Sequence, residues 1–280
     1  MEKTREEKIM NRLKEHYEYL EKRGFEIVFL ALQGSQNYML DVYDDEYMSD
    51  VDSKAVVLPS FEDFVHNRQP VSETIVLENN EHIDVKDIRV MFDTFKKQNI
   101  NFIEILFSEY GIVNEKYMVN VQPLFDNRGR IARLNYNQAL RCMAGMSKEK
   151  LKALQHPYPT IIAKIEKFGY DPKQLHHILR MNDFMKKYIV GKNYGECLIP
   201  DNREYLIEIK KGILPVDKAV ELANKVDEET YQLKEANLKD LPDEVDKEAI
   251  KILDEVKYNI LKQRFREEIL RWKKVNLMKG

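Results

Sequence analysis

The hydrophobic pattern of the chain changes near residue 87, and this change restricts the fold to a mixed class. Before it, short apolar runs rich in Val and Ile alternate with turn-forming residues, a pattern typical of β-strands. After it, apolar residues recur every three or four positions, as in amphipathic helices. We therefore predict an α+β fold, with a small mixed sheet and flanking helices in residues 1–120 and an α-helical domain in residues 121–280. The joint is expected at 120–129, where Pro123, Asn127 and Gly129 occur.

The clearest single element is the nearly continuous apolar run Glu26–Gln33, which fits a strand covered on both faces. An amphipathic helix precedes it, with one apolar stripe formed by Ile9, Leu13, Tyr17 and Leu20. Further strands are expected at residues 51–58, 74–77 and 82–86. Further helices are expected at roughly 88–95, 102–107, 130–154, 172–190, 203–211, 216–226 and 247–274.

Composition excludes several classes of protein. Hydrophobic residues make up 43% of the 280 residues and charged residues 33%, which excludes disorder. The chain has 45 Lys and Arg and 48 Asp and Glu, and the resulting net charge of -3 provides no overall attraction to nucleic acid. No apolar run approaches the ~18 residues of a membrane span, and the first residues are charged, so we expect a soluble, cytoplasmic protein without a membrane partner. Cys142 and Cys197 lack metal or disulfide spacing and are interpreted as buried thiols.

Three acidic residues are candidates for a metal site. Asp50 and Asp52 are two positions apart, so on a strand both carboxylates point to one face. Asp84 alternates with Ile83 and Val85, and it can join them if the two strands are neighbours. Hard divalent cations such as Mg²⁺ prefer oxygen ligands and leave positions open for substrate phosphates. For Asp50 and Asp52, the alternative is a solvated Asp-x-Asp at a strand edge. Asp87 is a rival to Asp84 for the third carboxylate, but it begins the next helix and is interpreted as its N-cap.

Two further features fit an anionic ligand. Gly34–Ser35 follows the apolar strand, and glycine lets backbone amides approach a phosphate; the alternative is an ordinary turn. Asp171 and Pro172 fit the start of a helix on which Lys173, His177 and Arg180 share one face; the alternative is a solvated basic face. Glu104 lies between apolar residues, and we expect it to pair with Arg89 or Arg180.

Taken in order, these motifs resemble the DNA polymerase β-type nucleotidyltransferase superfamily. Within it, the chain is similar to the RlaP branch, predicted nucleotidyltransferases associated with RNA ligases and RNA repair. The resemblance is carried by Gly34-Ser35, Tyr38, Leu40, Ser49-Asp50-x-Asp52, Asn99, Asn101, Glu104, Leu106, Tyr170, Lys173, His177 and Arg180. The chain departs from the branch in having Met39 in place of Gly, Ile100 in place of Pro, and a longer spacer from Gln36 to Ser49.

The resemblance implies a catalytic domain in residues 1–120 and a substrate-binding helical domain in residues 121–280. A nucleoside monophosphate would pass from a nucleoside triphosphate to a hydroxyl, with an RNA end favoured and a protein or small-molecule acceptor left open. Two Mg²⁺ ions, replaceable by Mn²⁺, would be held by Asp50, Asp52 and Asp84, and Asp84 would take the acceptor proton. Nucleotide-binding residues would be Gly34, Ser35, Lys173, His177 and Arg180.

A second interpretation is a catalytically inactive nucleotide- or RNA-binding module on the same fold. Met39 and the long spacer favour it. The retention of Asp50, Asp52 and Asp84 argues against it, because a module that only binds has little physical reason to keep three converging carboxylates.

Overall fold

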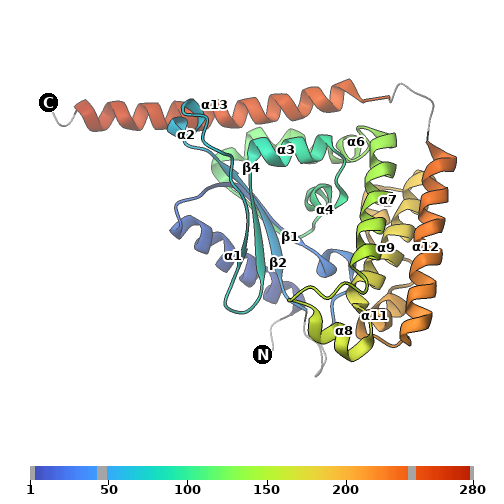
Figure 1. Ribbon diagram of the computed structural model, residues 1–280. Helices are drawn as coiled ribbons and strands as arrows, with labels where there is room; N and C mark the ends of the chain where they lie inside the picture. Colours follow the sequence, from blue (N-terminus) through green and yellow to red (C-terminus); the bar gives the residue numbers. More distant parts are fainter. Residues whose placement is uncertain (1–3, 43–48, 239–243, 278–280) are drawn as a thin grey trace.

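The structure is a computed structural model that describes residues 4–42, 49–238 and 244–277 (Figure 1). The long spacer from Gln36 to Ser49 therefore lies partly outside the described residues. On either side of residues 43–48, the Val42 N–H donates to Ser49 Oγ at 2.9 Å and the Ser49 N–H donates to the Val42 carbonyl at 2.8 Å. These two bonds hold Ser49 beside Val42, directly before Asp50.

The described residues of the first half form a five-stranded mixed sheet with the order β3-β4-β2-β1-β5. Strands β2 and β4 are parallel, and the other neighbouring pairs are antiparallel. The strands are β1 (Glu26–Gln33), β2 (Asp52–Leu58), β3 (Ser72–Val76), β4 (His82–Asp87) and β5 (Gly111–Val113). Together with the helical region that follows, this sheet confirms the predicted α+β class. Strand β5 was not predicted.

Both faces of the sheet are covered. Helix α1 (Arg5–Lys22) packs on one face through Ile9, Leu13 and Leu20. On the other face, the sheet shares one core with α3 (Ile88–Lys96), α5 (Met118–Asp126) and the C-terminal helix α13 (Lys247–Leu277). Figure 1 shows α13 lying across the end of the first half, beside α2 (Phe61–Val65) and α3. The end of the chain thus packs against its beginning.

The helical half is built around α9 (Pro172–Ile189), which lies beside α7, α11 and α12 (Figure 1). As predicted, Pro172 is in the first turn and the Asp171 carboxylate accepts a hydrogen bond from the Lys173 N–H. The neighbouring long helices are α7 (Tyr136–Ala153), α11 (Arg203–Lys211) and α12 (Val216–Asn237). The shorter helices of this half are α6 (Arg128–Ile131), α8 (Ile162–Phe168) and α10 (Tyr194–Leu198). The first half contains four further short helices, α4 (Ile100–Ile103), η1 (Ser35–Tyr38), η2 (Glu104–Leu106) and η3 (Glu115–Tyr117), among the described residues.

The predicted joint at 120–129 is not a loop. Its residues belong largely to α5 and α6, which pack against each other and against the sheet core. The division between residues 120 and 121 therefore stays a prediction. None of the helices in the described part of the chain is both long and apolar enough to span a membrane.

Candidate active site

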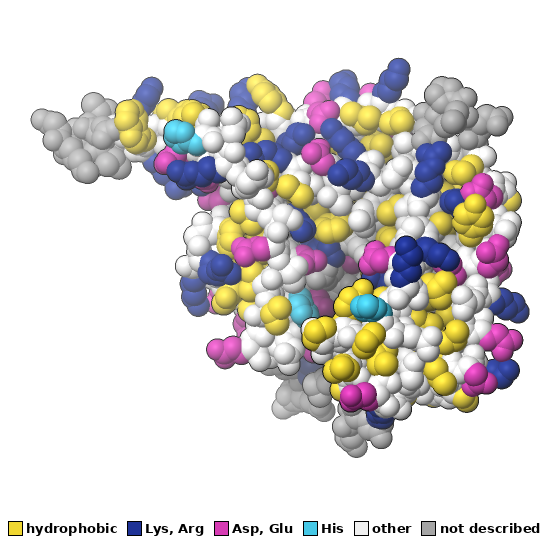
Figure 2. Space-filling view, viewed as in Figure 1, with side chains coloured by type: hydrophobic (Ala, Val, Ile, Leu, Met, Phe, Trp, Pro, Cys, Tyr) yellow, Lys and Arg dark blue, Asp and Glu magenta, His cyan; other side chains and the backbone are white. Residues whose placement is uncertain are grey.

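One pocket, with a volume of about 390 Å³, lies where the sheet meets the helical half. Figure 2 shows the molecule hollowed between these two halves, with acidic, basic and histidine side chains around the hollow. All eight residues singled out from the sequence line this pocket: Gly34, Ser35, Asp50, Asp52, Asp84, Lys173, His177 and Arg180. The chain therefore brings together residues that are up to about half its length apart.

One side of the pocket, here called the sheet wall, consists of Asp50, Asp52, Lys54 and Asp84. Lys54 is the direct partner of Asp84 in the parallel β2–β4 ladder, so residues 52, 54 and 84 present their side chains on the same face of the sheet. Asp50 differs from the prediction, because β2 begins at Asp52 and Asp50 precedes it in a loop. The Gln36 side-chain amide donates to the Asp50 carbonyl at 3.1 Å and holds this loop.

The turn between β3 and β4 fixes the position of Asp52. The His82 backbone N–H donates to Asp52 Oδ1 at 2.8 Å, and the His82 ring nitrogen Nδ1 lies 3.3 Å from the same oxygen. Glu81 in this turn accepts a bond from the Val51 N–H at 3.4 Å and lies 2.9 Å from His16 Nε2. Although burial opposes it, hydrogen bonds from His16 and Arg12 lower the pKa of Glu81 to about 2. Residues outside the predicted motifs thus anchor the backbone that carries the acidic pair.

Asp50 and Asp52 repel each other. Burial and then the charge of Asp52 raise the pKa of the Asp50 carboxyl above its ordinary value, against a smaller opposing effect of Lys173. A divalent cation between the two carboxylates would remove this repulsion, and carboxylate oxygens are the ligands that Mg²⁺ prefers. The pair therefore fits one such ion. Within the described ranges, no group of three or more His, Cys, Asp and Glu side chains is placed to hold a metal ion.

Asp84 already lies next to a cation within the protein. The buried Lys54 ammonium is 3.6 Å from Asp84 Oδ2 and 3.8 Å from Glu104 Oε1. Burial lowers the pKa of Lys54 to about 8, against the opposing charge of Asp84. Burial also raises the pKa of Glu104 to about 8, against the charge of Arg180, and the Tyr38 hydroxyl donates to the Glu104 carboxylate. Arg89, the other partner expected for Glu104, instead pairs with the helix cap Asp87.

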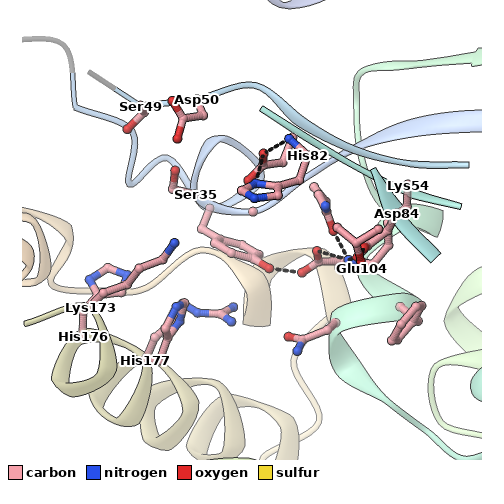
Figure 3. A pocket seen from close by; sticks show the side chains of 18 of the residues that line it. Ser35, Ser49, Asp50, Lys54, His82, Asp84, Glu104, Lys173, His176 and His177 are labelled. Atoms are coloured by element: carbon pink, nitrogen blue, oxygen red, sulfur yellow. Dashed lines mark hydrogen bonds and ion pairs between the residues drawn. The ribbon is translucent and has the colours of Figure 1, made fainter. Parts of the chain in front are cut away.

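The opposite side of the pocket, here called the helical wall, consists of Lys173, His177, Arg180 and Lys210. Figure 3 shows Lys173 and His177 on this side, across the pocket from Lys54, Asp84 and Glu104. Arg180 is only 3% exposed, yet its Nε and Nη1 have no hydrogen-bond partner among the described residues. Its guanidinium carbon lies 3.9 Å from the centroid of the Tyr38 ring. Burial lowers the pKa of Arg180, against the charge of Glu104.

The histidines of α9 are neutral in this arrangement. Burial lowers the pKa of His176 to about 3, and its Nδ1 lies 3.0 Å from the Leu206 carbonyl. Burial and the neighbouring His176, Arg180 and Lys173 lower the pKa of His177 well below its ordinary value. The predicted cationic face of α9 is therefore provided by Lys173 and Arg180, with His177 as a neutral hydrogen-bonding group between them.

Lys210 on α11 adds a cation that the sequence patterns did not indicate. Burial, followed by the charge of Lys173, lowers its pKa to about 8. Nothing in its local sequence distinguishes it from other basic residues at a helix end, so only the packing of α11 against α9 shows its place in the pocket.

The turn after β1 closes the pocket between its walls. Gly34 has φ +83°, a left-handed conformation that glycine adopts without strain, and a Cβ added there would lie 3.9 Å from Asp52 Oδ2. Met39, which stands where the RlaP branch has Gly, also has a positive φ of 55°. Ile100 stands where the branch has Pro, and it occupies the first position of α4, where a proline is tolerated. Met39 thus has a backbone conformation that favours glycine, and Ile100 has a helix position that accepts proline.

Comparison with known proteins gives little beyond this geometry. No protein-family model and no curated protein matches the chain. A similar solved structure is the crystal structure of a nucleotidyltransferase-like protein from Exiguobacterium sibiricum. It shares 10% sequence identity with this chain, covers 81% of this chain and 75% of its own, and has a TM-score of 0.30. The functional argument below therefore rests on the pocket.

Proposed function

We propose that the chain is a metal-dependent nucleotidyltransferase of the DNA polymerase β type, related to the RlaP branch. One observation carries the proposal: the same pocket has paired carboxylates on one wall and cationic side chains on the other, among them the buried Arg180, whose Nε and Nη1 have no hydrogen-bond partner among the described residues. A nucleoside triphosphate with a bound divalent cation is complementary to both, because its phosphates need positive charge and its metal needs oxygen ligands.

The donor nucleotide lies between the two walls. Gly34 and Ser35 bind the β- and γ-phosphates at the turn after β1, where the positive φ of Gly34 keeps side-chain bulk away from the ligand. Lys173, His177 and Arg180 contact the phosphates from α9. Nε and Nη1 of Arg180, which have no acceptor in the described part of the chain, supply hydrogen bonds to these phosphates.

The reaction is the transfer of a nucleoside monophosphate. The acceptor hydroxyl oxygen forms a bond to the α-phosphorus, the bond from that phosphorus to the bridging oxygen of the β-phosphate breaks, and pyrophosphate leaves. Asp84 accepts the hydroxyl proton. Asp50 and Asp52 would hold Mg²⁺, or Mn²⁺ in its place, which neutralises charge on the phosphate oxygens when bound. The protein positions the two substrates and balances charge.

The acceptor is a hydroxyl that reaches Asp84. An RNA end agrees with the association of the RlaP branch with RNA repair, and a protein or small-molecule hydroxyl is chemically equivalent at this site. The net charge of -3 means that an RNA acceptor would be held by local contacts near its end.

The proposal is tested by following the α-phosphate. Each of the four ribonucleoside triphosphates, labelled at the α-phosphate, is incubated with Mg²⁺ or Mn²⁺, a mixed small-RNA pool and the protein. We expect label on RNA or on the protein with wild type and none with Asp52→Asn. Asp93→Asn, an exposed acidic position on α3 outside the pocket, is the matched control and should behave as wild type.

Two results would contradict the proposal. Equal transfer by wild type and Asp52→Asn would show that the Asp52 carboxylate is not required for the reaction. Retained nucleotide binding without any release of pyrophosphate would favour the second interpretation, a binding module on the same fold.

A further inference from the structure

Lys54 is the one member of the sheet wall that is not acidic, and its place follows from the strand pattern. It is two residues after Asp52, so both side chains are on the same face of β2. In the parallel ladder it is directly opposite Asp84. Only 4% of the residue is exposed, and its ammonium lies beside the carboxylates of Asp84 and Glu104.

Side-chain oxygen atoms of three residues lie near the ammonium of Lys54. It lies 3.6 Å from Asp84 Oδ2 and 3.8 Å from Glu104 Oε1, and it donates to the side-chain oxygen of Gln33. The Phe102 ring, with its centroid 5.0 Å from Nζ, covers another side. The negative charge of Asp84 is thus already balanced from inside the protein.

This arrangement conflicts with the expected pair of ions. A second divalent ion shared by Asp52 and Asp84 would lie beside a buried ammonium group, and two like charges in a desolvated site repel strongly. In the part of the chain that the structure describes, no three metal-binding side chains are grouped to hold an ion. Asp50 and Asp52 fit one ion, and the surroundings of Asp84 fit none.

We propose that Lys54 takes the place of the second metal ion, so that the loaded site holds one divalent cation, on Asp50 and Asp52. The ammonium balances Asp84 and lies on the side of the site where the acceptor hydroxyl meets that carboxylate. This inference rests on the proposed function, since it assigns the cations of the same reaction.

Counting bound ions tests the inference without measuring activity. Mn²⁺ is titrated into the protein with a saturating non-hydrolysable analogue of the nucleoside triphosphate that binds best, and bound ions are counted by electron paramagnetic resonance. Two ions in a shared site lie about 3.5–4 Å apart and couple magnetically, whereas one ion gives an uncoupled spectrum. We expect one Mn²⁺ per chain and an uncoupled spectrum for wild type.

Variants at two lysines sharpen the count. Lys54→Met keeps the length of the buried side chain and removes its charge, so we expect a second, coupled Mn²⁺. Lys86→Met is the matched control, because Lys86 lies on the same sheet face near Phe102 but bonds to Ser72 Oγ at 2.6 Å and not to a carboxylate. It should keep one ion.

The outcomes separate the two claims. Two coupled ions in wild type would overturn this inference and leave the proposed function standing, and a single ion in folded Lys54→Met would overturn the replacement of metal by Lys54. No bound Mn²⁺ in wild type would overturn the proposed function together with it. If Lys54→Met fails to fold, the count for wild type still decides.

Discussion

The two walls of the pocket are built by different physical means. On the sheet wall, the positions of Asp52, Lys54 and Asp84 follow from strand register, and protein groups bond to each of them. On the helical wall, Arg180 is buried, two of its nitrogen atoms have no partner within the described ranges, and His177 is held neutral. Buried polar groups without partners are rare in folded proteins unless a ligand supplies the bond. The charges of the sheet wall are therefore largely matched by protein groups, apart from the repelling acidic pair, whereas the helical wall has buried hydrogen-bond donors that an anionic ligand would satisfy under the proposed function.

The largest effect is expected at the acidic pair. Asp50→Asn should reduce nucleotidyl transfer by about 100-fold or more, because it removes one of two ligands of the metal. Stability without metal should stay equal or rise slightly, since the charge of Asp52 disfavours ionised Asp50. Initial rates and thermal unfolding of the two proteins measure both. Undiminished transfer by Asp50→Asn would show that Asp50 is not needed to hold the metal ion.

The second prediction concerns the helical wall. Arg180→Met should weaken binding of the nucleotide roughly 10- to 100-fold, because a hydrogen bond to a charged group contributes about 1.5–3 kcal/mol. The melting temperature should change little, since Nε and Nη1 of Arg180 have no hydrogen-bond partner among the described residues and methionine can keep a contact with the Tyr38 ring. Calorimetric titration and thermal unfolding measure these two quantities.

A second arginine provides the control for Arg180. Arg133 donates to the Tyr188 and Lys192 carbonyls outside the pocket. We expect Arg133→Met to lower stability and to leave nucleotide affinity unchanged. If the two substitutions gave the same pattern, Arg180 would have a structural role and the comparison of the two walls would fail.

A smaller effect is expected from pH through Lys210, whose pKa is lowered to about 8. Above this pH its charge is lost, so nucleotide affinity should fall from pH 7 to pH 9. Stability of the ligand-free protein should respond in the opposite direction, because the unfolded lysine, with its higher pKa, binds the proton that the folded one has lost. The contribution of Lys210 to the free energy of unfolding therefore rises with pH above about 8.

The contribution of Lys210 is isolated by Lys210→Gln. Both pH trends should appear when the values for this variant are subtracted from those for wild type. The titration of Lys54 occurs in both proteins and therefore cancels in the subtraction. Affinity and urea-unfolding curves recorded at each pH measure them. Identical pH profiles for the two proteins would show that Lys210 does not contact the bound anion.

The smallest effect is expected at Met39, outside both walls. Its φ of 55° costs a residue with a side chain about 1 kcal/mol relative to glycine. Met39→Gly should therefore raise the free energy of unfolding by up to about 1 kcal/mol, reduced by the greater freedom of glycine in the unfolded chain. Nucleotidyl transfer should stay within about twofold. A large change in transfer would mean that this turn participates in the site.

Much of the fold could be predicted because its patterns are local. The run Glu26–Gln33 is apolar enough to be covered on both faces, and it forms β1 with these bounds. The three-residue β5 is too short to show any periodicity. Residues 120–129 have the composition of a turn, yet packing against the sheet core and α13 makes most of them helical. In such segments, tertiary contacts outweigh local preference.

The candidate site also has one part that the sequence predicts and another that it does not. Alternation predicted that Asp52 and Asp84 share a face if their strands are neighbours, and the β2–β4 pairing meets that condition. Helix spacing predicted that Lys173 and Arg180 lie on one face of α9, and both line the pocket. The roles of Lys54 and Glu81 depend on strand register and on the turn before β4, which a single sequence does not specify. Their local sequences carry no distinguishing motif.

The most direct test of the account is a crystal structure with Mn²⁺ and a non-hydrolysable nucleoside triphosphate, with the metal located by anomalous scattering. The account predicts a single Mn²⁺ on Asp50 and Asp52, with the triphosphate reaching Gly34–Ser35 and Arg180 on the opposite wall. A triphosphate bound outside this pocket, or bound within it without contact to either wall, would contradict it.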